Sequence, residues 1–165
     1  MNLARMWGFC SEKNHRLLVY EFVENGSLDR HLFSVRTVFG WKERFKVALG
    51  TAKGLAYLHH ECLEWVIHCD VKPENILLDE NFKPKISDFG LAKLCQRGGH
   101  GSSELTRIRG TKGYMAPEWA INLPITAKVD VYSYGVVILE VVRGIRLSSL
   151  VVDDEHHGIE KYQKW

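Results

Sequence analysis

Three short polar motifs limit what this chain can fold into. In chain order they are "HCDVKPEN" (68–75), "SDFG" (87–90) and "APE" (116–118). Asp70 and Asn75 are five positions apart, and Asp88 follows Asp70 by eighteen. The runs "WVIH", "NILLD" and "PKIS" adjoin the first two motifs and predict short strands. The polar motifs therefore lie on loops between short strands.

Two long segments have a helical pattern. From Trp41 to His60, apolar residues recur at three- and four-residue steps, which predicts a core helix that buries this stripe; the stripe consists of Phe45, Ala48, Leu49, Ala52, Leu55 and Ala56. A second helix is predicted from about Thr126 to Arg143, because Gly144 is a natural stop.

Shorter elements complete the expected α+β fold. The runs "ARMWGFC" and "RLLVYEF" (16–22) predict a β-hairpin before the turn "ENGS". The sequence "SLDRHLF" predicts a short helix with Ser27 as its N-cap. "QRGGHGSSE" predicts a mobile loop. The last residues, 148–165, predict a polar tail that is disordered.

The side chains of the first two motifs suit phosphoryl transfer from a metal-bound nucleotide. Such a site needs a carboxylate that orients an attacking hydroxyl and accepts its proton, a role that Asp70 can take. It needs hard oxygen ligands for Mg²⁺, which Asn75 and Asp88 supply. It also needs a cation that neutralises the moving phosphoryl group, and Lys72 is that cation.

Each of these features also has a plain structural interpretation. One motif alone is weak evidence, since an isolated aspartate in a loop is usually a turn or cap residue. A group of histidines and cysteines suggests zinc, although its spacing matches no zinc pattern; the group is His59, His60, Cys62, His68 and Cys69. The ordered set of three motifs favours catalysis.

The three motifs together resemble the eukaryotic protein kinase family. "DVKPEN" resembles its serine/threonine form, and "GLAYLHHEC" and "GTKGYMAPEW" resemble plant receptor-like kinases of the S-domain, or G-type lectin, group. The resemblance covers residues 1–147 and implies part of a kinase domain. That part comprises the last strands of the N-lobe and the first half of the mainly α-helical C-lobe.

The resemblance also assigns expected roles to single residues. It implies ATP and Mg²⁺ as cofactors and a protein serine or threonine as the group that accepts phosphate. The expected ATP-binding residues are Tyr20 as gatekeeper, Glu21, Phe22 and Val23 in the hinge, Leu77 under the adenine, and Asp88. Thr111 and Gly113 match the loop that holds the substrate, Asp130 matches the acid that fixes the catalytic-loop backbone, and His68 is expected to pack beside Phe89.

Cys69 departs from many members of the family, which place an arginine before the catalytic aspartate. That arginine can hold a phosphorylated activation loop, whereas cysteine carries no positive charge. Ser102, Ser103 and Thr106 are candidate phosphorylation sites, and their alternative role is to solvate the loop. The change at Cys69 therefore predicts altered regulation with the catalytic residues intact.

Composition and charge narrow the environment and the partners. A formal charge of +2 gives no reason to expect a nucleic-acid partner. Four scattered cysteines without a CxxC pair fit reduced thiols in a cytosolic setting. The longest apolar run, "YGVVILEVV", is too short to span a bilayer, and no signal segment is present, so this segment is expected to make no membrane contact. The resemblance implies the cytoplasmic side of the plasma membrane.

The kinase resemblance leaves out parts that hold ATP phosphates. The chain has no GxGxxG loop and no VAIK-like lysine before its first strand. We therefore expect this chain to be inactive alone, as part of a receptor-like serine/threonine kinase used in signalling. The alternative function is a non-catalytic, kinase-like binding or scaffold module.

Overall fold

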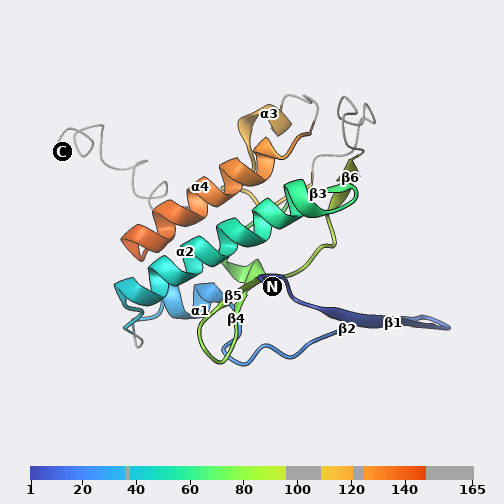
Figure 1. Cartoon of the computed structure of the whole chain (residues 1–165), viewed down its shortest axis with the longest axis horizontal. Coiled ribbons are helices and arrows are strands. Elements are labelled where there is room, and N and C mark those ends of the chain that lie inside the picture. The colour runs from blue at the N-terminus through green and yellow to red at the C-terminus, as the bar shows by residue number, and fades with distance from the viewer. Residues whose placement is uncertain (36–37, 96–108, 121–124, 148–165) are drawn as a thin grey trace.

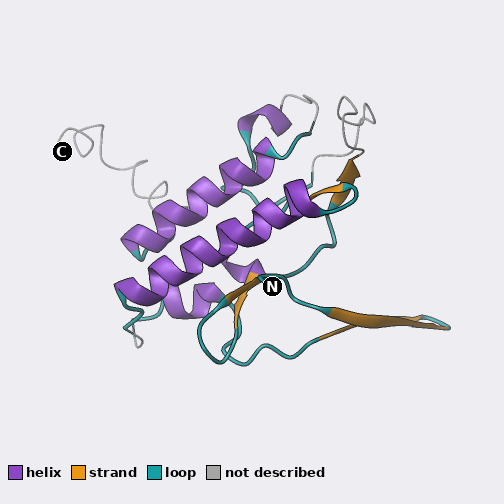
Figure 2. Cartoon of the chain, in the orientation of Figure 1, coloured by secondary structure: helices purple, strands orange, loops and turns teal. Residues whose placement is uncertain are grey.

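The structure is a computed structural model that describes residues 1–35, 38–95, 109–120 and 125–147. Helices and short strands alternate along the chain, so the predicted α+β class is confirmed (Figure 2). The glycine-rich loop, the polar tail and the three candidate phosphorylation sites lie outside the described residues; the sites are Ser102, Ser103 and Thr106. Among the described helices, none is long and apolar enough to cross a membrane.

The N-terminal hairpin forms as predicted. Strands β1 (Met6–Glu12) and β2 (His15–Tyr20) pair in antiparallel fashion, with Phe9 opposite Leu18. The hairpin projects away from the helices (Figure 1). Its side chains are largely exposed, Phe9 at 77% and Leu18 at 61%. The alternation of apolar residues therefore reports strand formation here but not burial within this chain.

Two more ribbons frame the polar motifs. Strand β4 (Ile76–Leu78) pairs with β5 (Pro84–Ile86), and β3 (Trp65–Ile67) pairs with β6 (Lys93–Cys95). The three predicted strands are confirmed, whereas β6 was not predicted. The motif at 68–75 joins β3 to β4, and its last three residues form a short 3₁₀ turn. The motif at 87–90 follows β5 directly, so both polar loops emerge from this pair of ribbons.

Two long helices lie side by side over the ribbons. Helix α2 (Trp41–Ala56) continues into a π-helical turn at Tyr57–Glu61, and α4 (Lys128–Arg143) runs beside it in the opposite direction (Figure 1). The hydroxyl of Tyr134 on α4 donates to the carbonyl oxygen of Ala48 on α2 at 2.8 Å. Helix α4 ends at Gly144 in the left-handed conformation (φ +70°), as predicted for a glycine stop.

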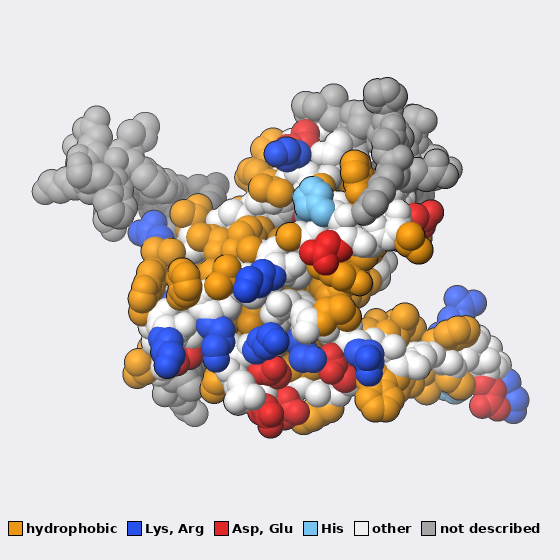
Figure 3. Space-filling model, in the orientation of Figure 1, with side chains coloured by type: hydrophobic (Ala, Val, Ile, Leu, Met, Phe, Trp, Pro, Cys, Tyr) orange, Lys and Arg blue, Asp and Glu red, His pale blue; other side chains and the backbone are white. Residues whose placement is uncertain are grey.

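The predicted buried stripe of α2 is wrong for most of its members. Phe45 and Leu49 are exposed at 62% and 45%. Figure 3 shows many hydrophobic side chains on the surface of the face it draws. The buried face instead contains Val47, Gly50, Thr51, Gly54 and Leu55. A Cβ at Gly54 would lie 2.8 Å from Cδ1 of Ile86, so the missing side chain admits β5. Hydrophobic periodicity counts only apolar side chains, so it does not reveal a close approach that depends on glycine.

The short helix α1 (Leu28–Leu32) closes the core on the side of β4. Leu28 and Leu32 are buried, and they join a cluster that includes Val47, Val71, Ile76, Leu78 and Val137. Ser27 occupies the predicted N-cap position, but its side chain makes no capping hydrogen bond. One further short helix, α3 (Pro117–Ala120), begins within the "APE" motif and was not predicted.

Candidate active site

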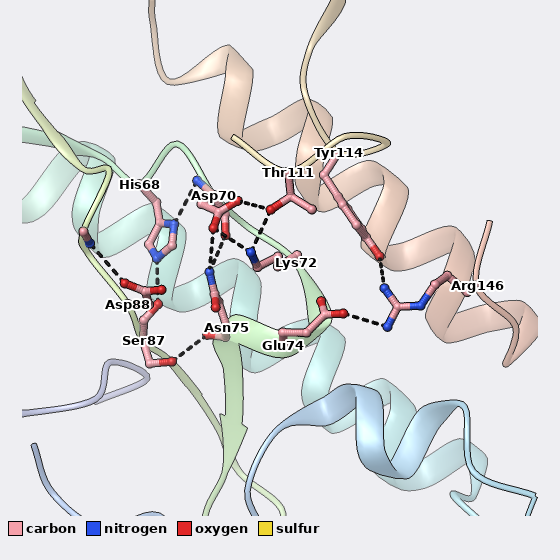
Figure 4. A network of polar contacts seen from close by, with 11 residues as sticks. His68, Asp70, Lys72, Glu74, Asn75, Ser87, Asp88, Thr111, Tyr114 and Arg146 are labelled. Carbon is pink, nitrogen blue, oxygen red and sulfur yellow. Dashed lines mark hydrogen bonds and ion pairs between the residues drawn. The ribbon is translucent and has the colours of Figure 1, made fainter. Parts of the chain in front are cut away.

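Asp70 is the centre of a compact polar network. Its carboxylate accepts a hydrogen bond from Thr111 Oγ1 at 2.6 Å on Oδ1. Its Oδ2 lies 2.8 Å from Lys72 Nζ and 3.1 Å from Asn75 Nδ2 (Figure 4). Asn75 also donates to the backbone carbonyl of Asp70 at 2.9 Å. The structure thus brings the predicted carboxylate, cation and amide together around one carboxylate that is 8% exposed.

Thr111 completes the network from a distant part of the chain. Lys72 Nζ donates to Thr111 Oγ1 at 2.7 Å, while the same hydroxyl donates to Asp70. Thr111 lies before α3, and its side chain points toward the loop at 68–75 (Figure 4). A turn that contains Gly113 (φ +94°) follows it. The Thr111 hydroxyl therefore contacts both the cation and the carboxylate of the motif at 68–75.

Two opposed effects set the pKa of Asp70. Burial raises the pKa, but the hydrogen bonds from Lys72 and Thr111, with the charge of Lys72 and the amide of Asn75, outweigh burial and hold the pKa below its ordinary value. The carboxylate is therefore ionised at neutral pH. An ionised carboxylate can only accept, which is what orientation of a hydroxyl requires.

Asp130 on α4 fixes the backbone just before Asp70. Its carboxylate accepts hydrogen bonds from the backbone N–H of His68 and of Cys69, each at 2.8 Å, and from His59 Nε2 at 2.8 Å. Asp130 is fully buried, and Cys69 has φ +67°, a conformation that non-glycine residues rarely adopt. The expected anchoring role of Asp130 is confirmed by these contacts.

His68 links the two polar motifs. Its Nδ1 accepts from the backbone N–H of Asp70 at 3.2 Å, so Nε2 carries the proton and donates to the carbonyl of Ser87 at 2.9 Å. Its ring packs edge-on against Phe89, with centroids 5.0 Å apart. This packing was predicted. His68 is fully buried, and its two hydrogen bonds connect the motif at 68–75 to the motif at 87–90.

The expected Mg²⁺ ligands supply suitable atoms. Asn75 donates to Asp70 through its amide nitrogen, which leaves its amide oxygen available as a metal ligand. The side chain of Asp88 is exposed, and its Oδ1 accepts from Gly90 N at 3.2 Å. Ser87 donates to the carbonyl of Asn75 through both N and Oγ, which holds the two motifs together. A carboxylate and an amide oxygen fit the preference of Mg²⁺ for hard oxygen ligands.

Four of the expected nucleotide-binding residues lie at the end of β2 or directly after it. Glu21 accepts from Lys85 Nζ on both oxygens, at 2.8 and 2.9 Å, and from Arg5 N at 2.8 Å. These hydrogen bonds, that from Lys85 first, hold the pKa of Glu21 below its ordinary value. Tyr20 is 38% exposed and Phe22 82%, while Val23 is buried and Leu77 is half-buried on β4. The ion pair between Glu21 and Lys85 joins the segment after β2 to β5.

The thiol of Cys69 lies in an apolar cluster. Cys69 is 3% exposed among residues that include Ile67, Trp119 and Val129. Burial first, and then the negative charge of Asp130, raise the pKa of Cys69 to about 12. The position thus carries a side chain without positive charge, as the sequence indicated, and the structure adds that this side chain is buried.

Sequence reasoning missed a second polar network beside the first. Arg146 pairs with Glu74 at 2.7 Å (Figure 4). Nearby, Tyr114 donates to Glu140 at 2.8 Å. Glu74 lies within the motif at 68–75, but Arg146 follows the predicted helix stop. No local pattern connects the two, and a lone arginine after a helix has the pattern of an ordinary surface residue.

Comparison with known proteins identifies relatives over almost the whole chain. The family described as "Protein kinase domain" matches residues 1–164. A Zea mays protein named as a receptor protein kinase, ZmPK1, is 64% identical over 165 residues, which cover 98% of this chain and 20% of that protein. A G-type lectin S-receptor-like serine/threonine-protein kinase from Arabidopsis thaliana is 55% identical over 158 residues, covering 94% of this chain and 18% of that protein.

A third relative has the same kind of name. LECRK4 from Oryza sativa subsp. japonica, also a G-type lectin S-receptor-like serine/threonine-protein kinase, is 61% identical over 142 residues, 86% of this chain and 17% of that protein. The chain spans about a fifth of the length of these relatives. The chain therefore belongs to the protein kinase family, and its relatives within that family are plant receptor-like serine/threonine kinases.

Proposed function

We propose that the protein that carries this chain transfers the γ-phosphoryl group of ATP to serine or threonine hydroxyls of a protein substrate. The observation that carries the proposal is the triangle of Asp70, Lys72 and Thr111, closed by three contacts of 2.6 to 2.8 Å. It joins a carboxylate, a cation and a hydroxyl in the arrangement that phosphoryl transfer to an alcohol requires.

Each residue then has one chemical role. Asp70 orients the substrate hydroxyl and accepts its proton, while a new P–O bond forms and the bond between the γ-phosphorus and the β,γ-bridging oxygen breaks. Lys72 neutralises the charge on the transferred group. Because the pKa of Asp70 is lowered, Asp70 is a weak base, and its main contribution is orientation. Thr111 keeps the carboxylate turned toward the incoming hydroxyl.

ATP and Mg²⁺ complete the proposed reaction. Asn75 and Asp88 would hold Mg²⁺, which when bound neutralises phosphate charge. The hinge residues 20–23 would hold the adenine through their backbone, above Leu77. In keeping with the names of the relatives, we place this segment on the cytoplasmic side of the plasma membrane, with a protein substrate and with no nucleic acid as partner.

The test replaces Asp70 by asparagine in the full-length protein. Asp70→Asn keeps the size of the side chain but removes the proton acceptor, so the rate of transfer from labelled ATP should fall about 10²–10⁴-fold. Asp79→Asn is the matched control, because Asp79 lies in an exposed turn. Equal rates for Asp70→Asn and the wild type would refute the assignment. A wild-type protein that binds ATP but transfers no phosphate would favour the non-catalytic scaffold.

A further inference from the structure

The guanidinium of Arg146 lies between two parts of the candidate site. Its Nη2 is 2.7 Å from Oε1 of Glu74, and its Nη1 donates to the hydroxyl oxygen of Tyr114 at 3.4 Å (Figure 4). Its Cζ lies 4.6 Å from the centre of the Phe33 ring, at the end of α1. A planar fork that also stacks on a ring suits these contacts, whereas a compact ammonium does not.

The acceptors of this guanidinium are themselves fixed. The Tyr114 hydroxyl donates to Glu140 Oε2 at 2.8 Å, and Glu140 Oε1 accepts from Leu147 N at 2.9 Å. Tyr114 and Glu140 are 4% and 1% exposed. Burial, then the hydrogen bond to Glu140, raises the pKa of Tyr114, so its hydroxyl stays protonated and donates to Glu140. Its oxygen remains able to accept from Arg146.

Each contact of the guanidinium is linked to a residue that holds Asp70, one by chain adjacency and the other by a hydrogen bond. On one side, Glu74 directly precedes Asn75, whose amide donates to Asp70. On the other side, Tyr114 N donates to the carbonyl of Thr111 at 3.1 Å, and the Thr111 hydroxyl donates to Asp70. The loop at 68–75 (the catalytic loop of the proposed function) and the turn at 111–114 (the Thr111 turn) are therefore connected twice, directly at Asp70 and again through the guanidinium.

We propose that Arg146 is a positioning residue that sets the catalytic loop and the Thr111 turn in register by bridging Glu74 and Tyr114. The expected effect of Arg146 on rate rests on the proposed function. The expected effect of Arg146 on the structure of the two segments does not. The fork matters more than the charge, because one terminal nitrogen serves each acceptor. Lysine keeps the charge but presents one nitrogen.

Steady-state kinetics of the full-length protein test the effect on rate. Arg146→Ala should lower kcat about tenfold, and Arg146→Lys should restore little of the loss. The KM for ATP should change less than about twofold, because the hinge belongs to other elements. Arg143→Ala is the matched control, since Arg143 is an exposed arginine at the same end of α4. It should leave kcat unchanged.

Amide hydrogen exchange tests the structural part without requiring phosphate transfer. The reporters are the N–H groups of Asn75, bonded to Lys72 O at 3.0 Å, and of Tyr114. In Arg146→Ala both should exchange about tenfold faster or more, and in Arg143→Ala neither should change. If Arg146→Ala does not fold, Arg146→Lys is compared instead, because it keeps the charge and the stem over Phe33.

Two outcomes overturn the inference. Unchanged exchange at both amides would show that the bridge does not hold the loops. Full recovery of kcat and of exchange in Arg146→Lys would show that charge alone suffices. A wild-type protein without transfer activity would refute the proposed function separately, and the exchange experiment would still decide the role of Arg146.

Discussion

Replacing Asp130 with asparagine should have two effects at once. It should destabilise the domain, and it should displace the loop at 68–75. The carboxylate serves three donors: Cys69 N on Oδ1, and His68 N with His59 Nε2 on Oδ2. Asparagine keeps one oxygen and adds an NH₂ group that is also a donor. Its best orientation keeps the oxygen on His68 and His59, so the NH₂ group faces Cys69 N.

The expected cost follows from this mismatch. A buried N–H without an acceptor costs about 1–3 kcal/mol, and the two remaining hydrogen bonds lose the assistance of the charge, about 1 kcal/mol in total. We expect a loss of about 2–4 kcal/mol in the free energy of unfolding. The lost bond also frees the backbone of Cys69 from φ +67°, so transfer activity should fall as well.

Chemical denaturation of the full-length protein measures this loss. The matched control is Asp79→Asn, since Asp79 accepts from the backbone N–H of Asn81 and of Lys83 through one oxygen in an exposed turn. An amide oxygen can keep both bonds, so the control should change stability by about 0.5 kcal/mol or less. A loss for Asp130→Asn below about 1 kcal/mol, or equal to the control, would refute the reasoning.

Two further predictions concern Asp88 and Cys69. Asp88→Ala should weaken nucleotide binding in the presence of Mg²⁺ and leave it unchanged without Mg²⁺, because a hard ligand is removed; titrations of this variant and of Asp79→Ala would show an equal Mg²⁺ dependence if the assignment is wrong. Because the pKa of Cys69 is raised to about 12, its thiol stays protonated below that pH, so iodoacetamide at pH 8 should label the exposed Cys10 and spare Cys69 in the folded protein. Rapid native labelling of Cys69, read by mass spectrometry, would contradict its burial.

The sequence predicts those parts of the site whose functional residues lie close together in the chain. Asp70, Lys72 and Asn75 lie on one loop, and their types alone predict a catalytic role for that loop without knowledge of distant contacts. The strands around the loop were predicted because short apolar runs end at polar residues. The N-terminal hairpin was predicted for the same reason.

The parts that it misses depend on contacts between distant segments. Gly54 lies in the buried face of α2 because β5 approaches there, which hydropathy cannot show. Strand β6 forms because it pairs with β3, and the motifs at 68–75 and 87–90 both lie between these two strands in the chain. The bridge of Arg146 to Glu74 likewise needs α4 to end beside the catalytic loop. In each case the partner, rather than the local pattern, decides the structure.

The dependence of the catalytic loop on Asp130 also fixes the order in which the site can mature. Asp130 lies 62 positions after His68 and 61 after Cys69, so the ribosome makes the complete loop motif before its acceptor exists. Closing a chain segment of this length costs about 4 kcal/mol of entropy or more, which packing of α4 on α2 must offset. A nascent chain can therefore display the whole motif at 68–75 and still lack an ordered site. Maturation of the site becomes coupled to synthesis of α4.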